Sequence, residues 1–501
     1  MNQLLLKILV FLSGAAVMGI EMAASRLLRP FFGDSILIWA NIIGLILIYL
    51  TAGYFLGGRW ADRDPRPATF YRILAWAGFA IGILPFIAKP FLYLAIPALE
   101  QFDAGLGFVS FAGTLALFVV PITLLGCVSP FAIRLSTRDV ASSGSTAGNL
   151  YSLSTFGRIV GVFGTVFVLL AILGTRGTYI AFSLALLSGA LIGIAGDSIT
   201  RALRYAILLV IVLALALSAS NGAIKQSAGL VYETESFYNF IQVIDDNGWR
   251  LLTVNEGQAY QSAYRADRVL SGGIWDLFLI ASYFASKESP RNVLMIGLAA
   301  GTVARAYSEI YPAIPIDGVE LDPAIIAVGQ TYFAMTQPNL NAIAGDGRAF
   351  LRRAGEYDVI AIDAYRQPYI PFHLTTVEFF RETRAHLTPN GVVALNAARA
   401  PNDYRLVDAL SATMRQVFPS VYLIDHPNNA NTLIVATNQP TRLDDFRANV
   451  AALRDPNLQI VAAQALPSAR IAEQTDPIFT DDHAPVENLI NDIIFRYALG
   501  Q

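Results

Sequence analysis

Two carboxylates in the C-terminal half of the chain follow apolar runs of the kind that form buried strands. Asp363 comes directly after residues 359–362 ("VIAI"), and Glu320 ends the run at 316–320 ("IDGVE"). In open sheets of parallel strands, ligands bind beyond the carboxyl ends of the strands. Asp363 could therefore act as a general base at such a site, and Glu320 could hold a ribose diol through two hydrogen bonds.

Two glycine-containing turns add to this pattern. Gly297 and Gly301 lie in "IGLAAGT" (296–302). Glycines there would let the backbone approach a ligand at a helix N-terminus. An ordinary strand-to-helix turn without a ligand would show the same pattern. Asp346 and Gly347 lie in "AGDGRAFL" (344–351). Asp346 could accept a hydrogen bond from an adenine amino group, cap the following helix, or do both. Together with Glu320, these turns predict a nucleoside-binding site.

The elements that must position these residues alternate between strand and helix from about residue 291 onward. This alternation predicts a parallel, Rossmann-like α/β sheet covered by helices on both faces. Before it, "FYNFIQVIDDNGWRLLTVNEG" holds two strand-like runs about Asn247-Gly248, a strong hairpin signal. We expect a small β-hairpin subdomain at 228–258 and a Rossmann-like catalytic domain at 259–501.

The N-terminal part has a different composition. The whole chain is 54% hydrophobic and 15% charged, with a mean hydropathy of +0.50. A helix needs about 20 apolar residues to cross a hydrocarbon core of about 30 Å. Seven apolar stretches approach or exceed this length, at about 4–25, 36–57, 73–96, 107–133, 150–173, 177–196 and 203–220. We expect residues 1–222 to form an α-helical transmembrane bundle of about seven spans, with the lipid bilayer as its partner.

The loops between these stretches bear on orientation. Most positive charge is held by Lys7, Arg59, Arg63, Arg66, Arg72, Arg134, Arg138, Arg201 and Arg204. The positive-inside rule then places the N-terminus in the cytoplasm. Seven spans would leave the C-terminal domain outside. A separate crossing by "FIAKPFLYLAIPALEQF" (86–102), or a stretch lying in the interface, would return it to the cytoplasm, where we expect the catalytic domain.

Two charged residues lie inside apolar stretches, where charge is costly. Glu21 could pair with Arg26 or Arg29 or face the bundle interior, and Arg158 lies in "STFGRIVGVFG". Each is interpreted either as part of a structural pair or as a mark of a substrate path.

The order and spacing of the glycine turn, Glu320, "GDG" and the strand ending in Asp363 resemble those of spermidine synthases, the polyamine aminopropyltransferases. "ETESFYNFIQV" (233–243) and "FFRETRAHLTPNGVVALN" (379–396) also look like that family, and the resemblance covers about residues 228–440. The N-terminal half looks like the membrane region of bacterial proteins in which such a domain follows a helical bundle.

The resemblance implies a transferase that moves an aminopropyl group from decarboxylated AdoMet, a co-substrate, to a diamine such as putrescine. Asp363 would accept the proton of the attacking amine, no cofactor would be tightly bound, and the catalytic domain could form a homodimer. By position, the donor would contact Asn239, Gly297, Gly301, Glu320, Asp346 and Gly347. The acceptor would contact Trp275, Asp276, Tyr365 and Arg366.

Several positions depart from the family pattern. Ala300 replaces an acid that helps to hold the aminopropyl nitrogen of the donor, and Arg366 replaces a second acid three residues after the base. Trp275-Asp276 stands at a Tyr-His or Tyr-Gln pair, and Asn239 stands at a glutamine.

A cationic diamine needs compensating carboxylates, which Asp276, Asp481 or Asp482 could supply. Alternatively, Arg366 could favour an anionic acceptor such as a lipid head group, and AdoMet itself could be the donor. Three functions therefore stay open. They are an aminopropyltransferase, an AdoMet-dependent methyl- or alkyltransferase acting on a membrane-associated or anionic acceptor, and a non-catalytic polyamine sensor or transport-linked protein.

Other classes are disfavoured by composition. The formal net charge of −3 and the lack of a basic patch interleaved with aromatics argue against a nucleic-acid partner. Cys127 is the single cysteine, so no disulfide can form within the chain. The four histidines show no metal-ligand spacing, and no metal is expected. His373 could line the site or lie in a surface loop.

Overall fold

The computed structural model describes residues 2–498 except residues 34, 101–105, 138, 219–223, 258, 313 and 367, and leaves out the side chains of residues 95–110. Arg138, counted above among the basic residues, is thus outside the described residues. The chain divides into two compact units, Met1–Gln226 and Ser227–Gln501, here called unit 1 and unit 2.

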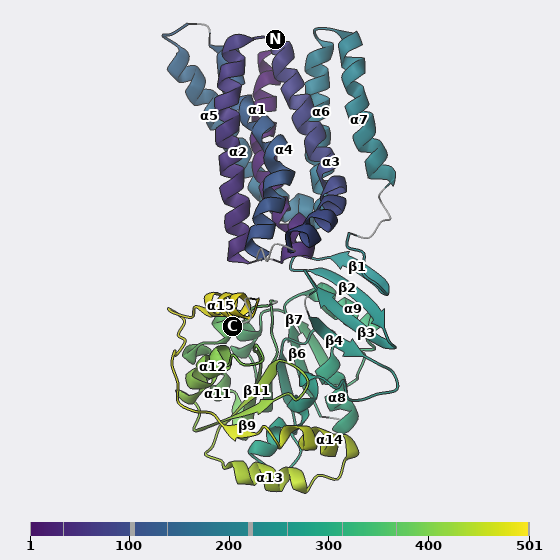
Figure 1. The fold of residues 1–501 in the computed structure, drawn as a ribbon, viewed down its shortest axis with the longest axis vertical. Coiled ribbons are helices and arrows are strands. Elements are labelled where there is room, and N and C mark those ends of the chain that lie inside the picture. Colours follow the sequence, from purple (N-terminus) through teal and green to yellow (C-terminus); the bar gives the residue numbers. More distant parts are fainter. Residues whose placement is uncertain are drawn as a thin grey trace. The chain divides into compact units, whose positions relative to one another are not determined.

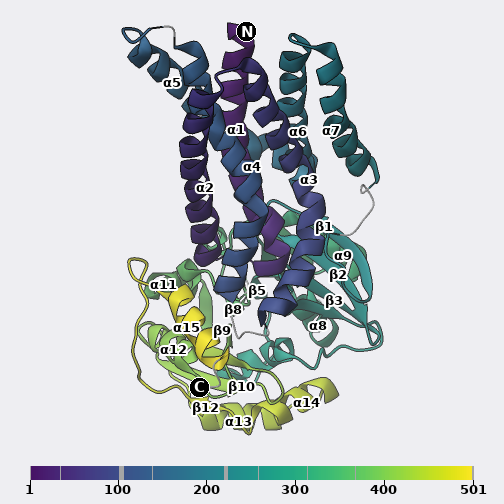
Figure 2. The same ribbon diagram turned by 45° about the horizontal axis from the view of Figure 1, so that its top comes forward.

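Unit 1 is a bundle of long helices that run side by side (Figures 1 and 2). They are α1 (Gln3–Phe32), α2 (Ile36–Arg63), α3 (Pro67–Glu100), α4 (Leu106–Ser136), α5 (Ser143–Gly164), the π-helical η1 (Thr165–Leu169), α6 (Leu170–Ala195) and α7 (Ile199–Ser218). Glycines, which have no side chain, let the backbones of neighbouring helices approach closely. A Cβ atom on Gly53 of α2 would lie 2.8 Å from the Cα of Gly126 in α4.

Six helical stretches in the described residues are long and apolar enough to cross a membrane. One of them, Ser143–Ala195, is 53 residues long and comprises α5, η1 and α6. Within it, Gly174 leaves helical geometry at φ 65° and ψ −175°, a conformation that glycine tolerates. The chain turns back there, so it passes along the bundle seven times (Figure 1). The separate crossing considered for 86–102 is wrong, because residues 86–100 continue α3.

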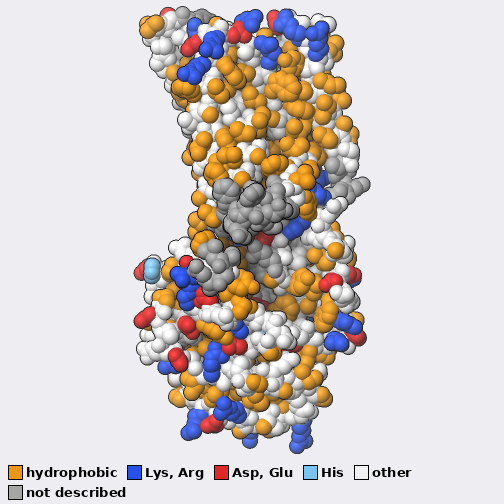
Figure 3. All heavy atoms as spheres, in the orientation of Figure 1, with side chains coloured by type: hydrophobic (Ala, Val, Ile, Leu, Met, Phe, Trp, Pro, Cys, Tyr) orange, Lys and Arg blue, Asp and Glu red, His pale blue; other side chains and the backbone are white. Residues whose placement is uncertain are grey.

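Basic side chains gather at one end of the bundle. The N-terminus lies there together with the α2–α3, α4–α5 and α6–α7 connections, and α7 runs away from this end (Figure 1). Figure 3 shows the Lys and Arg side chains of this end next to a largely hydrophobic surface. The N-terminus and the last residues of α7 therefore lie at opposite ends of the bundle.

The two charged residues of the apolar stretches lie within unit 1. Glu21 is buried in the bundle. Arg158 of α5 donates a hydrogen bond to the hydroxyl group of Tyr54 in α2. The Arg158 side chain thus connects α5 with α2, which is consistent with a structural role for this residue.

Unit 2 is built on an eight-stranded sheet with the order β12-β10-β11-β9-β8-β5-β6-β7. Its strands are β5 (Val293–Ile296), β6 (Ile316–Glu320), β7 (Leu340–Ala344), β8 (Tyr357–Ile362), β9 (Leu387–Ala398), β10 (Ser420–Asp425), β11 (Asn431–Thr437) and β12 (Arg470–Ile471). The five strands from β7 to β9 are parallel, whereas β11, β10 and β12 add antiparallel pairings. A wholly parallel sheet was expected. The connection between β10 and β11 is too short for a parallel crossover, which needs a dozen or more residues.

Helices cover both faces of this sheet. Leu294 and Ile296 of β5 pack with α11 (Val377–Ala385), α12 (Arg405–Arg415) and α15 (Val486–Ala498), which lie together in Figure 2. Val293 and Met295 pack on the other face, because side chains alternate along a strand. That face is covered by η2 (Ile274–Phe284), α8 (Thr302–Ile310), α13 (Leu443–Ala451) and α14 (Pro456–Ala465).

A second, antiparallel sheet has four strands where two were expected. Its strands are β1 (Leu230–Glu235), β2 (Phe240–Asp246), β3 (Trp249–Val254) and β4 (Tyr260–Tyr264), in that order. Asn247 and Gly248 join β2 and β3 with φ values of 49° and 81°, as a tight hairpin turn requires. The apolar face of this sheet packs on α9 (Pro323–Tyr332).

Candidate active site

Asp363 lies where the two central parallel strands end together. Ile362 of β8 pairs with Ile296 of β5, and the backbone N–H of Asp363 donates to the Ile296 carbonyl oxygen at 2.9 Å. The neighbours of β5 are β8 on one side and β6 on the other, so the chain order reverses here. Such a switch point is where open α/β sheets bind ligands.

Gly297 makes this approach possible. Its φ is 92°, and a Cβ atom at this position would lie 2.4 Å from the backbone oxygen of Asp363. A larger residue would be strained and would push the end of β8 away. Gly347, at the start of α10 (Gly347–Leu351), is equally confined, because its Cβ would lie 2.4 Å from Cγ2 of Ile296. Both predicted glycines thus border the end of β5.

Two neutral donors hold the Asp363 carboxylate. Trp275 Nε1–H donates to Oδ2 at 3.0 Å, and Asn396 Nδ2–H donates to Oδ1 at 2.9 Å. Burial raises the pKa of Asp363 to about 6, although the two hydrogen bonds lower it. A carboxyl group with this pKa is ionised at neutral pH and well matched to accept a proton.

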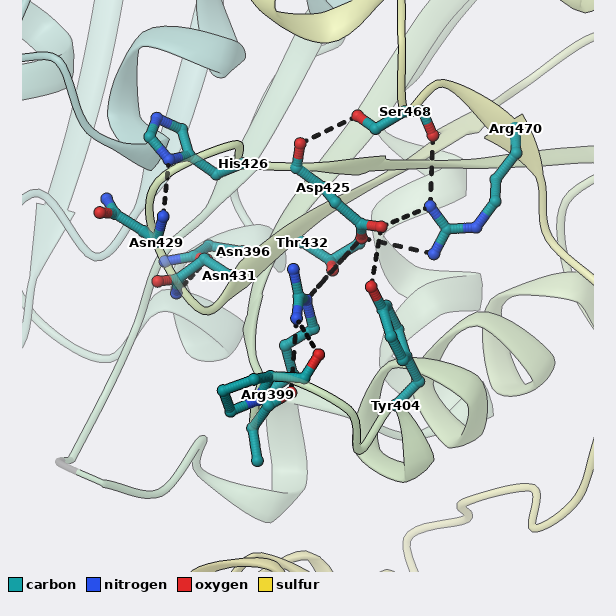
Figure 4. A network of polar contacts seen from close by, with 12 residues as sticks. Asn396, Arg399, Tyr404, Asp425, His426, Asn429, Asn431, Thr432, Ser468 and Arg470 are labelled. Atoms are coloured by element: carbon teal, nitrogen blue, oxygen red, sulfur yellow. Dashed lines mark hydrogen bonds and ion pairs between the residues drawn. The ribbon is translucent and has the colours of Figure 1, made fainter. Parts of the chain in front are cut away.

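Asn396 was missed from the sequence. It lies near the carboxyl end of β9, next to Leu395, which pairs with Ile362 of β8. Asn396 lies beside Asn431 (Figure 4), whose Nδ2–H donates to Asn396 Oδ1 at 3.0 Å. The Asn396 amide therefore turns its own N–H toward Asp363. The available signal was a single polar residue in the otherwise apolar run "GVVALN".

Asn431 is itself held at the end of a cross-linked group of strands. Asp425, the last residue of β10, accepts hydrogen bonds from Thr432 at 2.6 Å, Arg470 at 2.7 Å and Tyr404 at 3.0 Å (Figure 4). Thr432 follows Asn431 in β11, and Arg470 belongs to β12. This network fixes the strand ends that support the Asn431–Asn396–Asp363 chain of hydrogen bonds.

Glu320 lies at the end of β6, on the other side of β5. Its Oε2 accepts from the Ala299 N–H at 2.9 Å and its Oε1 from the Asp322 N–H at 3.1 Å. Burial raises the pKa of Glu320 to about 7, against the lowering effect of the two backbone donors. Asn239, in the β1–β2 connection, donates to Oδ2 of Asp322 at 2.9 Å. Asn239 is thereby joined to the loop that follows Glu320.

Asp346 caps α10, which is one of its two predicted roles. Its Oδ1 accepts from the Ala349 N–H at 2.8 Å. Its other oxygen lies 3.4 Å from Nε2 of His373, which places that histidine beside Asp346.

The part of the chain that contains this site is similar to known proteins. The family model "Spermine/spermidine synthase domain" matches residues 279–437. A probable polyamine aminopropyl transferase of Bifidobacterium longum is 31% identical over 280 residues, which cover 52% of this chain and 62% of that protein. A polyamine aminopropyltransferase of Vibrio vulnificus is 33% identical over 217 residues, which cover 41% of this chain and 71% of that protein. The chain belongs to the spermidine synthase family of polyamine aminopropyltransferases.

The family resemblance extends to methyltransferases. The eEF1A lysine and N-terminal methyltransferase of Bos taurus is 27% identical over 185 residues, covering 34% of this chain and 26% of that protein. The positions at which this chain departs from the spermidine synthase pattern are therefore the ones that bear on the choice between aminopropyl and methyl transfer.

Ala300, where the family pattern has an acid, faces apolar surroundings. It is 2% exposed and packs against Ile241, Leu252 and Val328 of the apolar cluster beneath β2 and β3. Its N–H donates to Oγ of Ser262 at 2.9 Å. Gly301 follows with a φ of 85° and begins the turn into α8. Position 300 is therefore apolar, and it offers no carboxylate to the aminopropyl nitrogen of a donor.

Two of the three substitute carboxylates suggested from the sequence already have hydrogen-bond partners within the fold. Asp276 is buried and accepts from the Ser271 N–H at 2.9 Å, the Ser271 hydroxyl at 2.8 Å and the Gly272 N–H at 2.7 Å. Asp481 pairs with Arg348 at 2.8 Å and accepts from Thr376 at 2.6 Å. Asp482 is exposed. Asp276 is thus bound within its own loop, whereas Asp481 joins its segment to Arg348 of α10 and to Thr376, the residue before α11.

Tyr365 and Arg366, the other two positions suggested for the acceptor, differ in how they are held. The Tyr365 hydroxyl donates to the Asn396 carbonyl oxygen at 3.0 Å and accepts from the Ala398 N–H at 2.8 Å, so it is used within the fold. Arg366 is exposed, and its backbone pairs with Tyr369. Within the described part of the chain, no group of three or more His, Cys, Asp and Glu side chains could hold a metal ion.

Proposed function

We propose that unit 2 transfers an aminopropyl group from decarboxylated AdoMet to an amine such as putrescine, with Asp363 as the proton acceptor. One observation carries this proposal. A carboxylate with a pKa of about 6 lies at the switch point of the sheet and is held by two neutral donors, Trp275 and Asn396. The chain spans 62% of the Bifidobacterium relative and 71% of the Vibrio relative, so the activity is inferred for the shared region.

The chemistry follows from the charges of the reactants. A protonated amine has no lone pair, so Asp363 first takes its proton. The nitrogen then attacks the methylene carbon next to the sulfonium, a C–N bond forms, and the C–S bond breaks with its electron pair passing to sulfur. The sulfonium is a good leaving group, and the site chiefly has to align the two reactants.

The donor contacts belong to the same proposal. Glu320 would bind the ribose diol through lone pairs that its two backbone donors leave unused. Asp346 and Gly347 would border the adenine, and Asn239 would act through the Asp322 loop. Gly297 and Gly301 would give the donor access to the backbone at the start of α8.

The full chain, purified in detergent, tests the proposal directly. Incubation with decarboxylated AdoMet and putrescine should form spermidine and the thioether nucleoside in equal amounts, detected by mass spectrometry. Absence of both products with active donor would contradict aminopropyl transfer to a diamine.

Ala300 and Arg366 favour a second candidate, an AdoMet-dependent methyl- or alkyltransferase acting on an anionic or membrane-associated acceptor. Among the described residues, no second carboxylate takes part in the hydrogen bonds around Asp363, and position 300 is apolar. The site therefore lacks the carboxylates that a cationic diamine would need. Calorimetry on the full chain with each donor decides between the two. Tighter binding of decarboxylated AdoMet supports aminopropyl transfer, and tighter binding of AdoMet supports the second candidate.

We also propose that unit 1 spans a membrane, since its helices have the required length and apolarity. The expected cytoplasmic location of unit 2 stays a prediction. Two features argue against it: a basic end places the N-terminus in the cytoplasm, and an odd number of passes, seven, then places unit 2 on the other side.

Cys127 is the single cysteine and is buried, so Glu288→Cys would add one exposed thiol. Labelling of this thiol in intact cells by a membrane-impermeant maleimide would place unit 2 outside the cytoplasm; labelling only after lysis would place it inside. A homodimer through unit 2 likewise stays a prediction.

A further inference from the structure

An apolar groove of about 580 Å³ lies in unit 1 near the basic end of the bundle. Its lining comes from α2, α3, α4 and α7, and consists of Trp60, Thr69, Arg72, Ile73, Trp76, Phe79, Ala80, Ile83, Val120, Leu124 and Tyr205. Trp76 is 48% exposed and Val120 is 55% exposed, so large apolar surface is open there. The volume is within the range of about 300–1,000 Å³ that is usual for ligand sites.

A polar pocket of about 130 Å³ adjoins this groove. Arg72 and Tyr205 line both spaces, and the remaining lining of the pocket is Arg66, Ala68, Ile194, Asp197 and Arg201. The pocket lies at the N-terminal turns of α3 and α7, which begin at Pro67 and Ile199. Helix N-termini carry partial positive charge, which favours an anion.

The side chains of the pocket leave an excess of positive charge. Arg66 is paired with Asp64, and Arg201 is paired with Asp197 at 2.7 Å. Arg72 donates to the Thr69 hydroxyl at 2.7 Å, and no carboxylate oxygen of the described residues lies within 4.0 Å of its guanidinium group. Three guanidinium groups and one carboxylate, Asp197, thus line the pocket. With Asp64, the partner of Arg66, counted as well, an excess of one positive charge remains, which one phosphodiester would neutralise.

We propose that the groove and the pocket together bind one anionic phospholipid. The phosphate group would lie against Arg72 and Arg201, and an acyl chain would occupy the groove between Trp76, Phe79 and Ile83. A free phosphate ion would use the pocket alone and would leave the adjoining apolar groove unexplained. This inference rests on the proposed membrane location of unit 1 and is independent of the reaction of unit 2.

The test uses the full chain in detergent and native mass spectrometry. Phosphatidylglycerol and phosphatidylcholine with identical acyl chains are added in parallel, and the bound fractions are compared. A basic residue near a lipid surface is worth about 1 kcal/mol, which is about fivefold in affinity. Arg72→Gln with Arg201→Gln should therefore weaken phosphatidylglycerol binding about 25-fold and weaken phosphatidylcholine binding less, because the choline cation of that lipid already offsets the charge of its phosphate group.

The matched control is Arg59→Gln with Arg204→Gln, which removes two exposed charges from the same end of the bundle outside both pockets. An equal loss in the control pair would overturn the site and show general attraction to the basic end. Arg72→Lys, which keeps the charge, should retain the lipid preference and guards against misfolding.

Two further measurements distinguish binding of the acyl chain in the groove from binding of the phosphate group in the pocket. Ala80→Trp should fill the groove and reduce phosphatidylglycerol binding, and no reduction would remove the acyl chain from the proposal. Full displacement of the lipid by millimolar inorganic phosphate would mean that the pocket binds phosphate alone. If the chain is absent from isolated membranes, the membrane location fails; if it is present without a lipid preference, the lipid site fails.

Discussion

Units 1 and 2 place their polar side chains in opposite ways. In unit 1 many of the basic residues lie at one end of the bundle, and helix contacts depend on glycines such as Gly53 and Gly126. In unit 2 polar side chains meet at the carboxyl ends of buried strands, where Asp363, Asn396 and Glu320 lie. The composition of unit 1 thus bears on its location, whereas the chemistry of the chain depends on a few side chains of unit 2.

The largest expected effect tests that assignment of chemistry to unit 2. Asp363→Asn removes the proton acceptor and should lower the rate of aminopropyl transfer roughly 10²- to 10⁴-fold, the usual contribution of a general base. The rate of spermidine formation by the full chain measures it.

Asp358→Asn is the matched control, because Asp358 lies on the same strand and binds Arg291 and Thr388 away from the site. It should keep most of the activity. An Asp363→Asn variant with unchanged turnover would mean that Asp363 is not the proton acceptor of the reaction.

The next effect tests the dependence of unit 1 on close backbone contact. A Cβ atom at Gly53 would lie 2.4 Å from the carbonyl oxygen of Thr123, whereas one at Gly58 would meet nothing within 4 Å. Gly53→Ala should therefore destabilise the bundle by about 1–3 kcal/mol through overpacking. Gly58→Ala on the same helix should be neutral or stabilising by up to about 1 kcal/mol. Thermal unfolding in detergent compares them, and equal melting temperatures would contradict the packing argument.

The two units also differ in how far the sequence predicted them. The helices of unit 1, and the glycine turn and Glu320 of unit 2, follow from patterns that are local in the chain. The separate crossing at 86–102 was wrong because apolar composition alone does not show where one long helix ends. Asn396 and Asn431 were missed because they reach Asp363 only through strand pairing, across 33 residues in the case of Asn396. The sequence also did not show the local partners of Asp276, which lie four and five residues away in its own loop.

A smaller effect tests the supporting hydrogen bond within unit 2. Asn396→Ala removes a donor that stabilises the ionised form of Asp363, so the pKa of Asp363 should rise above its value of about 6. Turnover at neutral pH should fall about tenfold, as for loss of one charge-assisted hydrogen bond. The acid limb of the pH–rate profile should move to higher pH. A lower rate with an unshifted profile would indicate loss of packing instead of loss of that hydrogen bond.

The smallest effect concerns the free energy of unfolding, which the buried Asp363 carboxylate lowers at neutral pH. The pKa of Asp363 is about 6 in the folded chain, above its ordinary value of 3.8, so the folded state holds this proton more tightly than the unfolded state. Its stabilising contribution is complete below pH 3.8 and is lost as the pH rises through about 6. A pKa shift of about two units corresponds to about 3 kcal/mol in the free energy of unfolding at neutral pH. An asparagine at position 363 would avoid this cost, but its weaker hydrogen bonds would lose about 1–2 kcal/mol of it again.

Asp363→Asn should therefore raise the free energy of unfolding by about 1 kcal/mol at pH 7.5 and leave it unchanged or lower at pH 4. Glu320, with a pKa of about 7, titrates nearby in both proteins, so the difference between variant and parent isolates Asp363. Thermal unfolding of both proteins across this pH range measures it. A gain of stability together with the loss of turnover would show that unit 2 keeps a destabilising carboxylate because its chemistry requires one. Equal pH dependence in the two proteins would mean that Asp363 is solvated and ionises at its ordinary pKa.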